Sequence, residues 1–402
     1  MAQGPNVLVD SGIPLFFDLV NAEEVGITPP QNRMGDSLRT WVRSLSVFQK
    51  EALVASSRTG KTWRLASDEG PYLDGHDAAP CPLAFLTTGM IASYMNEITA
   101  LAKKQGVEIR KLKLTQDNYY TMTGSMPKRT MVGGALPVEL LVEIDCDLDD
   151  SALAQFLMNA VYASPLNGLM RGQLESLFTL SKNGTEIGNG KAARMDGAVY
   201  PDPGDHFSAA HPIADPGFDP VVWPEGVTPK KPVQGGTAKA GSSLADEQNR
   251  TLNIGATCTL REDGMKEILQ LQYSPHGTSF KFLSEEAPEN GGLGRAPDAN
   301  SYVSAGIGFC FMTQFGRFVK MLNLDLSDYR VVQDSHFSLG GASGGTGKAG
   351  QADPLETHVY LETNESDDVA REMLDISEQT CFLHAFCKTD LKTKLKVQRI
   401  QV

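Results

Sequence analysis

Two cysteines and two serines occupy matching positions in this sequence. Cys310 and Cys381 have the same spacing along the chain as Ser93 and Ser164 in the first half. With only six cysteines in 402 residues, the chain does not resemble a secreted disulfide scaffold. In a reducing compartment, cysteines that matter are redox-active or catalytic, and the others are small buried hydrophobes. The paired Cys/Ser alternation favours a site that was once present twice and is now present once.

A second pattern, C-x2-H-x2-C, is formed by Cys381, His384 and Cys387. On a helix it places three potential zinc ligands along one stripe. Structural zinc normally has four ligands, usually with a loop between ligand pairs, and Cys387 matches the ordinary core position Met170. We therefore expect no metal, and we interpret His384 as a half-buried, hydrogen-bonded histidine. The alternative is a base or hydrogen-bond donor near Cys381.

Two further segments look functional but fail a closer test. His206 and His211 lie near acidic residues, yet their spacing matches no metalloprotease motif, so we expect surface side chains. Residues 338–350 (SLGGASGGTGKAG) resemble a phosphate-binding loop, but Ala342 replaces the first required glycine and Ala349 the Ser or Thr after Lys348. We expect a flexible loop near a site, serving as a lid, and no nucleotide or other cofactor.

Residues in the first half of the sequence match residues in the second half at one constant separation, without a gap. This separation is the one between Ser93 and Cys310. Residues 31–33 (QNR) return at 248–250, residues 79–80 (AP) return at 296–297, and single positions such as Glu69 and Glu286 also match. We predict a domain at 1–182 with serines at both cysteine positions, a Pro/Gly-rich linker at 183–245, and a domain at 246–402 with the cysteine pair. Phe218, Trp223 and the valines at 221–222 suggest that part of the linker packs on a domain.

Each copy shows the same order of elements. β-forming residues with turn signals come first, followed by helical spacing over residues 83–103 and 301–320. Two strands then precede a second helix, which begins after acidic or hydroxyl capping residues, and a final strand closes the unit. This β-meander, α, ββ, α, β order predicts an α+β fold.

The spacing of the two cysteines resembles that of the OsmC/Ohr family of thiol peroxidases. In that pattern one cysteine lies on a helix, about three turns after the helix begins at a proline or a similar residue. A second cysteine lies on another helix, at a separation close to that of Cys310 and Cys381. In the first copy, residues 68–76 (DEGPYLDGH) and 79–83 (APCPL) are similar to the family's approach to the helix.

The family resemblance implies a dimer whose long helices are wrapped by both sheets. A fused tandem of two OsmC-like domains would form that pseudo-dimer within one chain. Further oligomerisation of the pseudo-dimer stays open.

The resemblance also implies a reaction. A Cys310 thiolate would attack an organic hydroperoxide, Cys381 would capture the sulfenic acid as a disulfide, and an external dithiol would reduce it. The site should lower the thiol pKa with a nearby cation. Arg250 and Arg295 are the catalytic candidates for this cation, and the accessory positions are His384, Ser301 and Arg33.

The sequence departs from the family at one position. The family's helix glutamate, which orients the arginine, is replaced by Ser301 in the second copy and by Ala84 in the first. Two other functions therefore stay open. One is a hydrolase- or lyase-type catabolic enzyme in which Cys310 acts as nucleophile on a small organic or aromatic substrate. The other is a non-catalytic ligand-binding protein.

Composition limits the partners. The formal net charge is −13 and no basic stripe is present, which argues against nucleic acids and anionic membranes. No apolar run reaches the roughly 18 residues of a membrane helix, and the N-terminal segment lacks a positively charged leader. We expect a cytoplasmic protein that acts on a small molecule.

Overall fold

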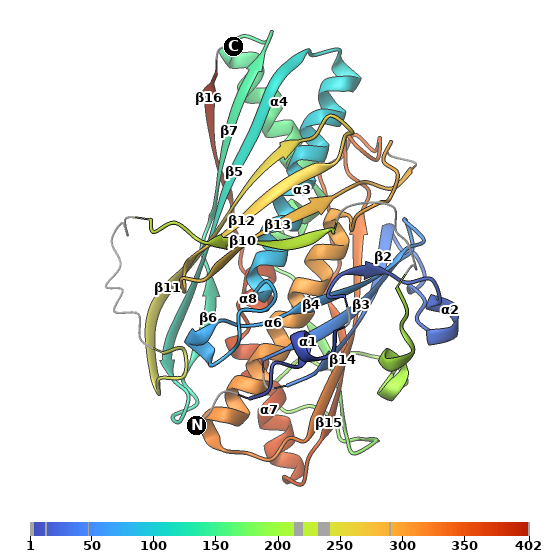
Figure 1. Cartoon of the computed structure of the whole chain (residues 1–402), viewed down its shortest axis with the longest axis vertical. Helices are drawn as coiled ribbons and strands as arrows, with labels where there is room; N and C mark the ends of the chain where they lie inside the picture. Colours follow the sequence, from blue (N-terminus) through green and yellow to red (C-terminus); the bar gives the residue numbers. More distant parts are fainter. Residues whose placement is uncertain are drawn as a thin grey trace.

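Two large β-sheets wrap a pair of long helices (Figure 1). The computed structural model describes residues 4–12, 14–46, 48–212, 220–231, 242–288 and 291–400. Most strand pairs in both sheets are antiparallel, and the helices follow the strands in separate groups along the chain. The predicted α+β class is confirmed.

The two central helices are α3 (Pro82–Gln105) and α6 (Ala299–Leu322). A proline suits the first turn of α3, and the Asp298 side chain caps α6 by accepting a hydrogen bond from the backbone N–H of Ser301. Every residue of α6 from Ala299 to Phe318 is buried, as expected for an interior helix. No helix in the described ranges is long and apolar enough to cross a membrane.

Glycines let α3 and α6 approach closely. A β-carbon added at Gly89 would lie 2.5 Å from the carbonyl oxygen of Ala299, and one at Gly306 would lie 2.9 Å from the β-carbon of Phe85. Gly306 is the repeat counterpart of Gly89, so each helix supplies the same position to the contact. The close contact therefore depends on glycine in both copies.

The first sheet mixes strands from the two halves of the chain. Its order is β1-β4-β3-β2-β14-β15-β8-β9. The meander of the first half joins the second half where β2 pairs antiparallel with β14, and β8 then runs parallel to β15. Its strands are β1 (Phe17–Asp18), β2 (Gly35–Ser44), β3 (Lys50–Ser56), β4 (Thr62–Ser67), β8 (Leu177–Lys182), β9 (Thr185–Glu186), β14 (Asp328–Ser338) and β15 (Glu356–Glu362).

The second sheet repeats this arrangement with the halves exchanged. Its order is β10-β13-β12-β11-β5-β7-β16, and β6 pairs with β5. Here β11 pairs antiparallel with β5, and β16 runs parallel to β7. The halves therefore interlock through both sheets. The strands are β5 (Ile109–Ser125), β6 (Val132–Ala135), β7 (Val138–Cys146), β10 (Val222–Val227), β11 (Glu247–Leu260), β12 (Lys266–Ser274), β13 (Thr278–Ser284) and β16 (Thr393–Arg399).

The second helix of each copy is broken at the residue that carries the Cys/Ser alternation. Ser164 lies between α4 (Asp150–Ala163) and α5 (Pro165–Arg171), and Cys381 lies between α7 (Asp367–Thr380) and α8 (Phe382–Lys388). Both residues have extended backbone, with ψ of 126° and 116°. The break directs each side chain toward the central helix of its own copy, as the contacts below show. The remaining short helices are α1 (Val7–Asp10), α2 (Ala22–Val25), η1 (Pro71–Leu73) and η2 (Gly204–Ala209).

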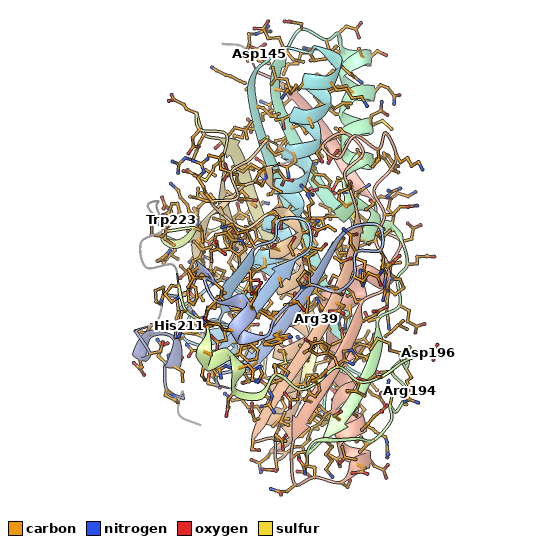
Figure 2. The ribbon with its side chains drawn as sticks, turned by 90° about the vertical axis from the view of Figure 1, so that its right-hand side faces the viewer. Arg39, Asp145, Arg194, Asp196, His211 and Trp223 are labelled. Carbon is orange, nitrogen blue, oxygen red and sulfur yellow. The ribbon has the colours of Figure 1, made fainter. Side chains whose placement is uncertain are left out.

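The connection between the copies is partly built into the fold. Strand β10 lies at the edge of the second sheet and pairs with β13. Val221 and Val222 are buried, and Trp223 packs against the main core (Figure 2). The prediction that this stretch packs on a domain is confirmed for these residues, whereas Phe218 lies outside the described residues. His206 and His211 both lie on the surface, as predicted, and a ring nitrogen of His206 contacts the carbonyl oxygen of Val25.

Candidate active site

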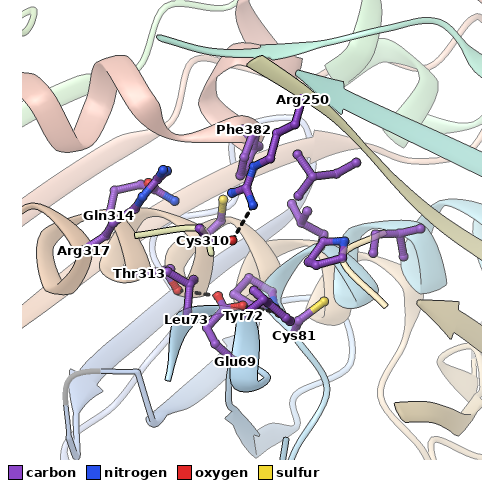
Figure 3. A pocket seen from close by; sticks show the side chains of 16 residues that line it. Glu69, Tyr72, Leu73, Cys81, Arg250, Cys310, Thr313, Gln314, Arg317 and Phe382 are labelled. Carbon is purple, nitrogen blue, oxygen red and sulfur yellow. Dashed lines mark hydrogen bonds between the residues drawn. The ribbon is translucent and has the colours of Figure 1, made fainter. Parts of the chain in front are cut away.

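A cavity around Cys310 takes its walls from both halves of the chain (Figure 3). We call it the thiol cavity. Its residues from the first half are Glu69, Tyr72, Leu73, Cys81, Pro82 and Leu83, and those from the second half are Ser243, Arg250, Leu252, Ile254, Pro275, Cys310, Thr313, Gln314, Arg317 and Phe382. The site therefore needs both copies, although the predicted cysteine pair belongs to one.

Cys310 lies in the middle of α6 and is 2% exposed. Its thiol faces that of Cys381 and the backbone N–H of Leu383 in α8. Burial raises the pKa of Cys310 well above the usual value for a thiol, and Cys381 and Glu69 raise it further. The expectation of a lowered thiol pKa is therefore wrong for this state, because Cys310 is held as a neutral thiol in a dry environment.

A carboxylate does reach the cavity, but from a segment that sequence reasoning did not select. Glu69 precedes η1, is 5% exposed, and accepts hydrogen bonds from Tyr72 (2.5 Å) and Thr313 (2.9 Å). Burial raises the pKa of this carboxyl group. The family resemblance directed attention to Ser301 and Ala84. The available signal was the recurrence of Glu69 as Glu286 in the second copy.

Of the two predicted arginines, the structure brings Arg250 to the cavity and leaves Arg295 outside it. Arg250 projects from β11 and donates a hydrogen bond to Ser243. Arg295 instead pairs with Glu285 (2.7 Å) and Asp263 (3.4 Å) at the protein surface. Arg33, the first-copy counterpart of Arg250, makes a two-pronged pair with Glu356 and does not line the thiol cavity.

Two further cations near the site were not anticipated. Arg317 lies two helical turns after Cys310, is 1% exposed and lines the cavity. Lys50 in β3 is fully buried, and its Nζ donates to the carbonyl oxygen of Phe48 (2.7 Å). Burial lowers the pKa of Lys50, although Glu69 and Asp68 oppose that shift. A single arginine within an apolar helix gives no spacing signal, so the sequence did not indicate Arg317.

The remaining predicted residues lie apart from the cavity walls. His384 is fully buried, and its ring lies 4.7 Å from that of Phe311 and 5.6 Å from that of Phe178, measured between centroids. Neither ring nitrogen has a hydrogen-bond partner among the described residues. The prediction of a half-buried, hydrogen-bonded His384 is therefore wrong. Burial lowers its pKa to about 4. No group of three or more metal-ligating side chains is found in the described parts of the chain.

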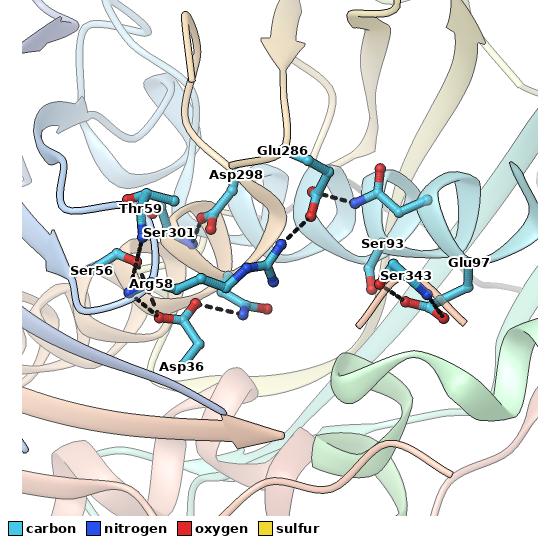
Figure 4. Close-up of polar contacts among 12 residues, drawn as sticks. Asp36, Ser56, Arg58, Thr59, Ser93, Glu97, Glu286, Asp298, Ser301 and Ser343 are labelled. Carbon is cyan, nitrogen blue, oxygen red and sulfur yellow. Dashed lines mark hydrogen bonds and ion pairs between the residues drawn. The ribbon is translucent and has the colours of Figure 1, made fainter. Parts of the chain in front are cut away.

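A second cavity occupies the equivalent place in the other copy (Figure 4). We call it the serine cavity. It is lined by Arg58, Ser93, Asn96, Glu97, Pro165, Glu286, Asp298, Ala299, Asn300, Gly340 and Ser343, and all but the last two are repeat counterparts of thiol-cavity residues. The hydroxyl oxygens of Ser93 and Ser164 are 2.7 Å apart. The serine pair thus takes the place that the cysteine pair takes in the thiol cavity.

The serine cavity is an ionic cluster rather than a thiol site. Arg58 donates to Glu286 (2.6 Å), and Glu97 accepts hydrogen bonds from the backbone of Ala342 (2.8 Å) and Ser343 (3.2 Å). The glycine-rich loop predicted as a lid therefore lies on this cavity. Ser301, a predicted accessory residue, lies beside it at the start of α6, where Asp298 caps the helix. Burial raises the pKa of Asp298 to about 7.

The family comparison falls on the copy with the cysteine pair. The family model described as OsmC-like protein matches residues 291–396. This part of the chain is an OsmC-like domain. It includes Cys310, Arg317 and Cys381, whereas Arg250 and Glu69 lie outside the matched range. The family domain therefore carries both thiols, and the remainder of the chain completes the cavity around them.

The other comparisons add little. An OsmC-like hydroperoxide resistance protein from Jannaschia sp. CCS1 has a solved structure that is 19% identical, with a TM-score of 0.20. The likeness covers 33% of this chain and 81% of that one. No curated protein matches the chain. The likeness to the OsmC-like family therefore rests on the family model and applies to residues 291–396.

Proposed function

We propose that this protein is a thiol peroxidase that reduces organic hydroperoxides with Cys310 and Cys381. The observation that carries the proposal is the pair of buried thiols facing each other, with Cys310 lining the cavity, within the segment that matches the OsmC-like family. We place the reaction in the cytoplasm, where thiols are kept reduced. The serine cavity has hydroxyl groups at the equivalent positions and has no sulfur to oxidise.

The reaction balances with an external dithiol. The Cys310 sulfur attacks the terminal peroxide oxygen, the O–O bond breaks, and the alcohol leaves with the thiol proton, giving a sulfenic acid on Cys310. The Cys381 thiol then attacks that sulfur and water leaves, giving a disulfide. A dithiol reduces the disulfide and is itself oxidised. Two thiols are thereby oxidised for each hydroperoxide reduced to an alcohol.

Arg250 is the residue we propose to activate the thiol. In this state it donates to Ser243, and the carboxyl group of Glu69, together with Cys381, raises the pKa of Cys310. A thiolate needs a cation beside it in so dry a cavity. Turning the guanidinium from Ser243 toward Cys310 would supply that cation. Glu69, already held by Tyr72 and Thr313, would then fix the position of the arginine.

The proposal is tested by hydroperoxide consumption under turnover with dithiothreitol. We expect wild-type protein to consume cumene hydroperoxide, and Cys310→Ser to consume none. Cys381→Ser should react once and then lose disulfide-dependent turnover. Cys258→Ser is the matched control, because Cys258 is buried but does not line the cavity, and it should keep wild-type turnover.

Two results would reject the peroxidase. Turnover of a small organic substrate that needs Cys310 but survives Cys381→Ser would identify a nucleophilic catabolic enzyme. Unchanged ligand affinity in Cys310→Ser, with no turnover of any substrate, would identify a binding protein.

A further inference from the structure

Arg317 is a buried cation that the thiol chemistry does not use. It is 1% exposed, it lines the thiol cavity, and its Nε and Nη2 atoms have no hydrogen-bond partner among the described residues. The main influences on the Cys310 thiol are burial, Cys381 and Glu69, and not Arg317. An unpaired guanidinium in a protein interior carries a large desolvation cost, as other buried ions do. Such a group needs another explanation.

The cavity has more positive than negative groups. Arg317 and Arg250 both reach it, and the Nε of Arg250 also lacks a partner within the described ranges. Glu69 is the carboxylate among the cavity walls, and its two oxygens already accept hydrogen bonds from Tyr72 and Thr313. Burial, followed by the charge of Arg250, lowers the pKa of Arg317 to about 9. Arg317 is therefore still charged at pH 7. Glu69 opposes the shift, but its two oxygens are taken by Tyr72 and Thr313, and no ion pair joins it to Arg317 in the described part of the chain.

Apolar side chains form much of the remaining cavity wall. Leu73, Leu83, Leu252, Ile254 and Phe382 lie around the two arginines and Cys310. Gln314 adds a buried side-chain oxygen that has no partner in the described chain. A ligand that satisfies these groups would carry an anionic end, a nearby hydrogen-bond donor and a hydrocarbon body. Carboxylates suit a guanidinium particularly well, because two oxygens can accept two parallel N–H bonds.

We propose that Arg317 forms a carboxylate-binding subsite, which holds one end of an organic acid while the other end of that acid faces Arg250 and Cys310. Under the proposed function, on which this assignment rests, that acid is the peroxide or the dithiol reductant. The subsite makes the protein selective for an anionic form of one of these two substrates. Arg317 is thus a specificity-determining residue of the site.

Binding is measured first, because it does not depend on turnover. We expect calorimetric titration of the reduced protein to show hexanoate binding at least tenfold more tightly than hexanol. Arg317→Met should weaken hexanoate binding by about tenfold or more, because it removes one pair of charge-assisted hydrogen bonds. Arg295→Gln, an arginine outside the cavity, is the matched control and should bind like wild type. Thermal unfolding of each variant verifies that it is folded.

Kinetics then identify which substrate carries the carboxylate. If it is the peroxide, Arg317→Met raises KM for a hydroperoxy-carboxylate by about tenfold and leaves KM for cumene hydroperoxide unchanged. If it is the reductant, KM rises for dimercaptosuccinate and not for dithiothreitol. Equal binding of hexanoate and hexanol by wild type, or unchanged hexanoate binding in Arg317→Met, would overturn the subsite. If the protein does not reduce hydroperoxides, the hexanoate titration still tests the subsite, because it measures binding and not turnover.

Discussion

At the scale of single residues, the protein holds its key thiol in the neutral form. Cys310 is buried next to a second thiol and a carboxyl group, and both neighbours act against ionisation. Its reactivity must therefore depend on how the charged groups around it are arranged. Burial, Cys381 and Glu69 all raise the thiol pKa, whereas Arg250 would lower it if its guanidinium moved beside the sulfur, as proposed above.

Glu69→Gln should lower the pKa of Cys310. The substitution removes a negative charge that raises the thiol pKa, while the amide keeps hydrogen bonds to Tyr72 and Thr313. The pH dependence of Cys310 alkylation, followed by peptide mass spectrometry in a Cys381→Ser background, measures the shift. Glu286→Gln changes the equivalent carboxylate of the serine cavity and should leave the titration unmoved. A titration that is unchanged, or moved to higher pH, in Glu69→Gln would show that Glu69 does not act on the thiol.

His384 should make the protein less stable in mild acid. The folded pKa is about 4 against 6.5 for a free histidine, so the unfolded chain binds the extra proton between these values. Its contribution to stability is complete above pH 6.5 and falls by about 3 kcal/mol as the pH drops to 4. Urea unfolding across this range should show a smaller loss in His384→Phe than in wild type. Matching pH profiles in the two proteins would contradict the burial of a neutral imidazole.

At the scale of elements, local patterns in the sequence predicted more than long-range ones. Helical spacing and capping residues identified both central helices within a few residues of their ends. The partner of each strand could not be predicted, because the pairing of β2 with β14 joins residues from opposite ends of the chain. For the same reason Glu69 was quoted as part of a motif but not recognised as a cavity residue. Cys310, Cys381 and Arg250 were found because each leaves a pattern in the repeat.

The contact between α3 and α6 gives a prediction at this scale. Gly89→Ala should lower the free energy of unfolding by about 1–3 kcal/mol, because the new methyl group overlaps the backbone of α6. Gly306→Ala should act in the same direction at the equivalent position. Gly4→Ala, where a methyl group meets nothing within 4 Å, serves as control. Urea unfolding measures all three, and wild-type stability in both helix variants would refute the close approach.

At the scale of the whole molecule, the two copies depend on each other. Each sheet joins a meander from one half to strands from the other, and the thiol cavity draws residues from both. The serine cavity has the Ser93 and Ser164 hydroxyl groups where the other half has the two thiols, and it holds an ionic cluster centred on Arg58 and Glu286.

Fragments 1–212 and 220–402 should therefore fold only together. Fragment 1–212 alone exposes the edges of β2 and β5, which normally pair with β14 and β11. Fragment 220–402 alone exposes the edges of β14 and β11. We expect either fragment expressed alone to aggregate or to unfold without cooperativity, and the two expressed together to copurify as a one-to-one complex. A cooperative, monomeric 220–402 fragment would show that the second copy is an independent domain.

If Cys310 and Cys381 form one redox pair, as we propose, thiol counting after one equivalent of cumene hydroperoxide will reveal it. The reduced protein, the Cys310→Ser variant and the Cys381→Ser variant are compared by intact mass and peptide mapping. We predict rapid loss of two thiols in wild type, with a Cys310–Cys381 cross-linked peptide, and a sulfenic acid on Cys310 when Cys381 is absent. If both thiols and the peroxide persist, Cys310 and Cys381 are not a peroxide-reducing pair.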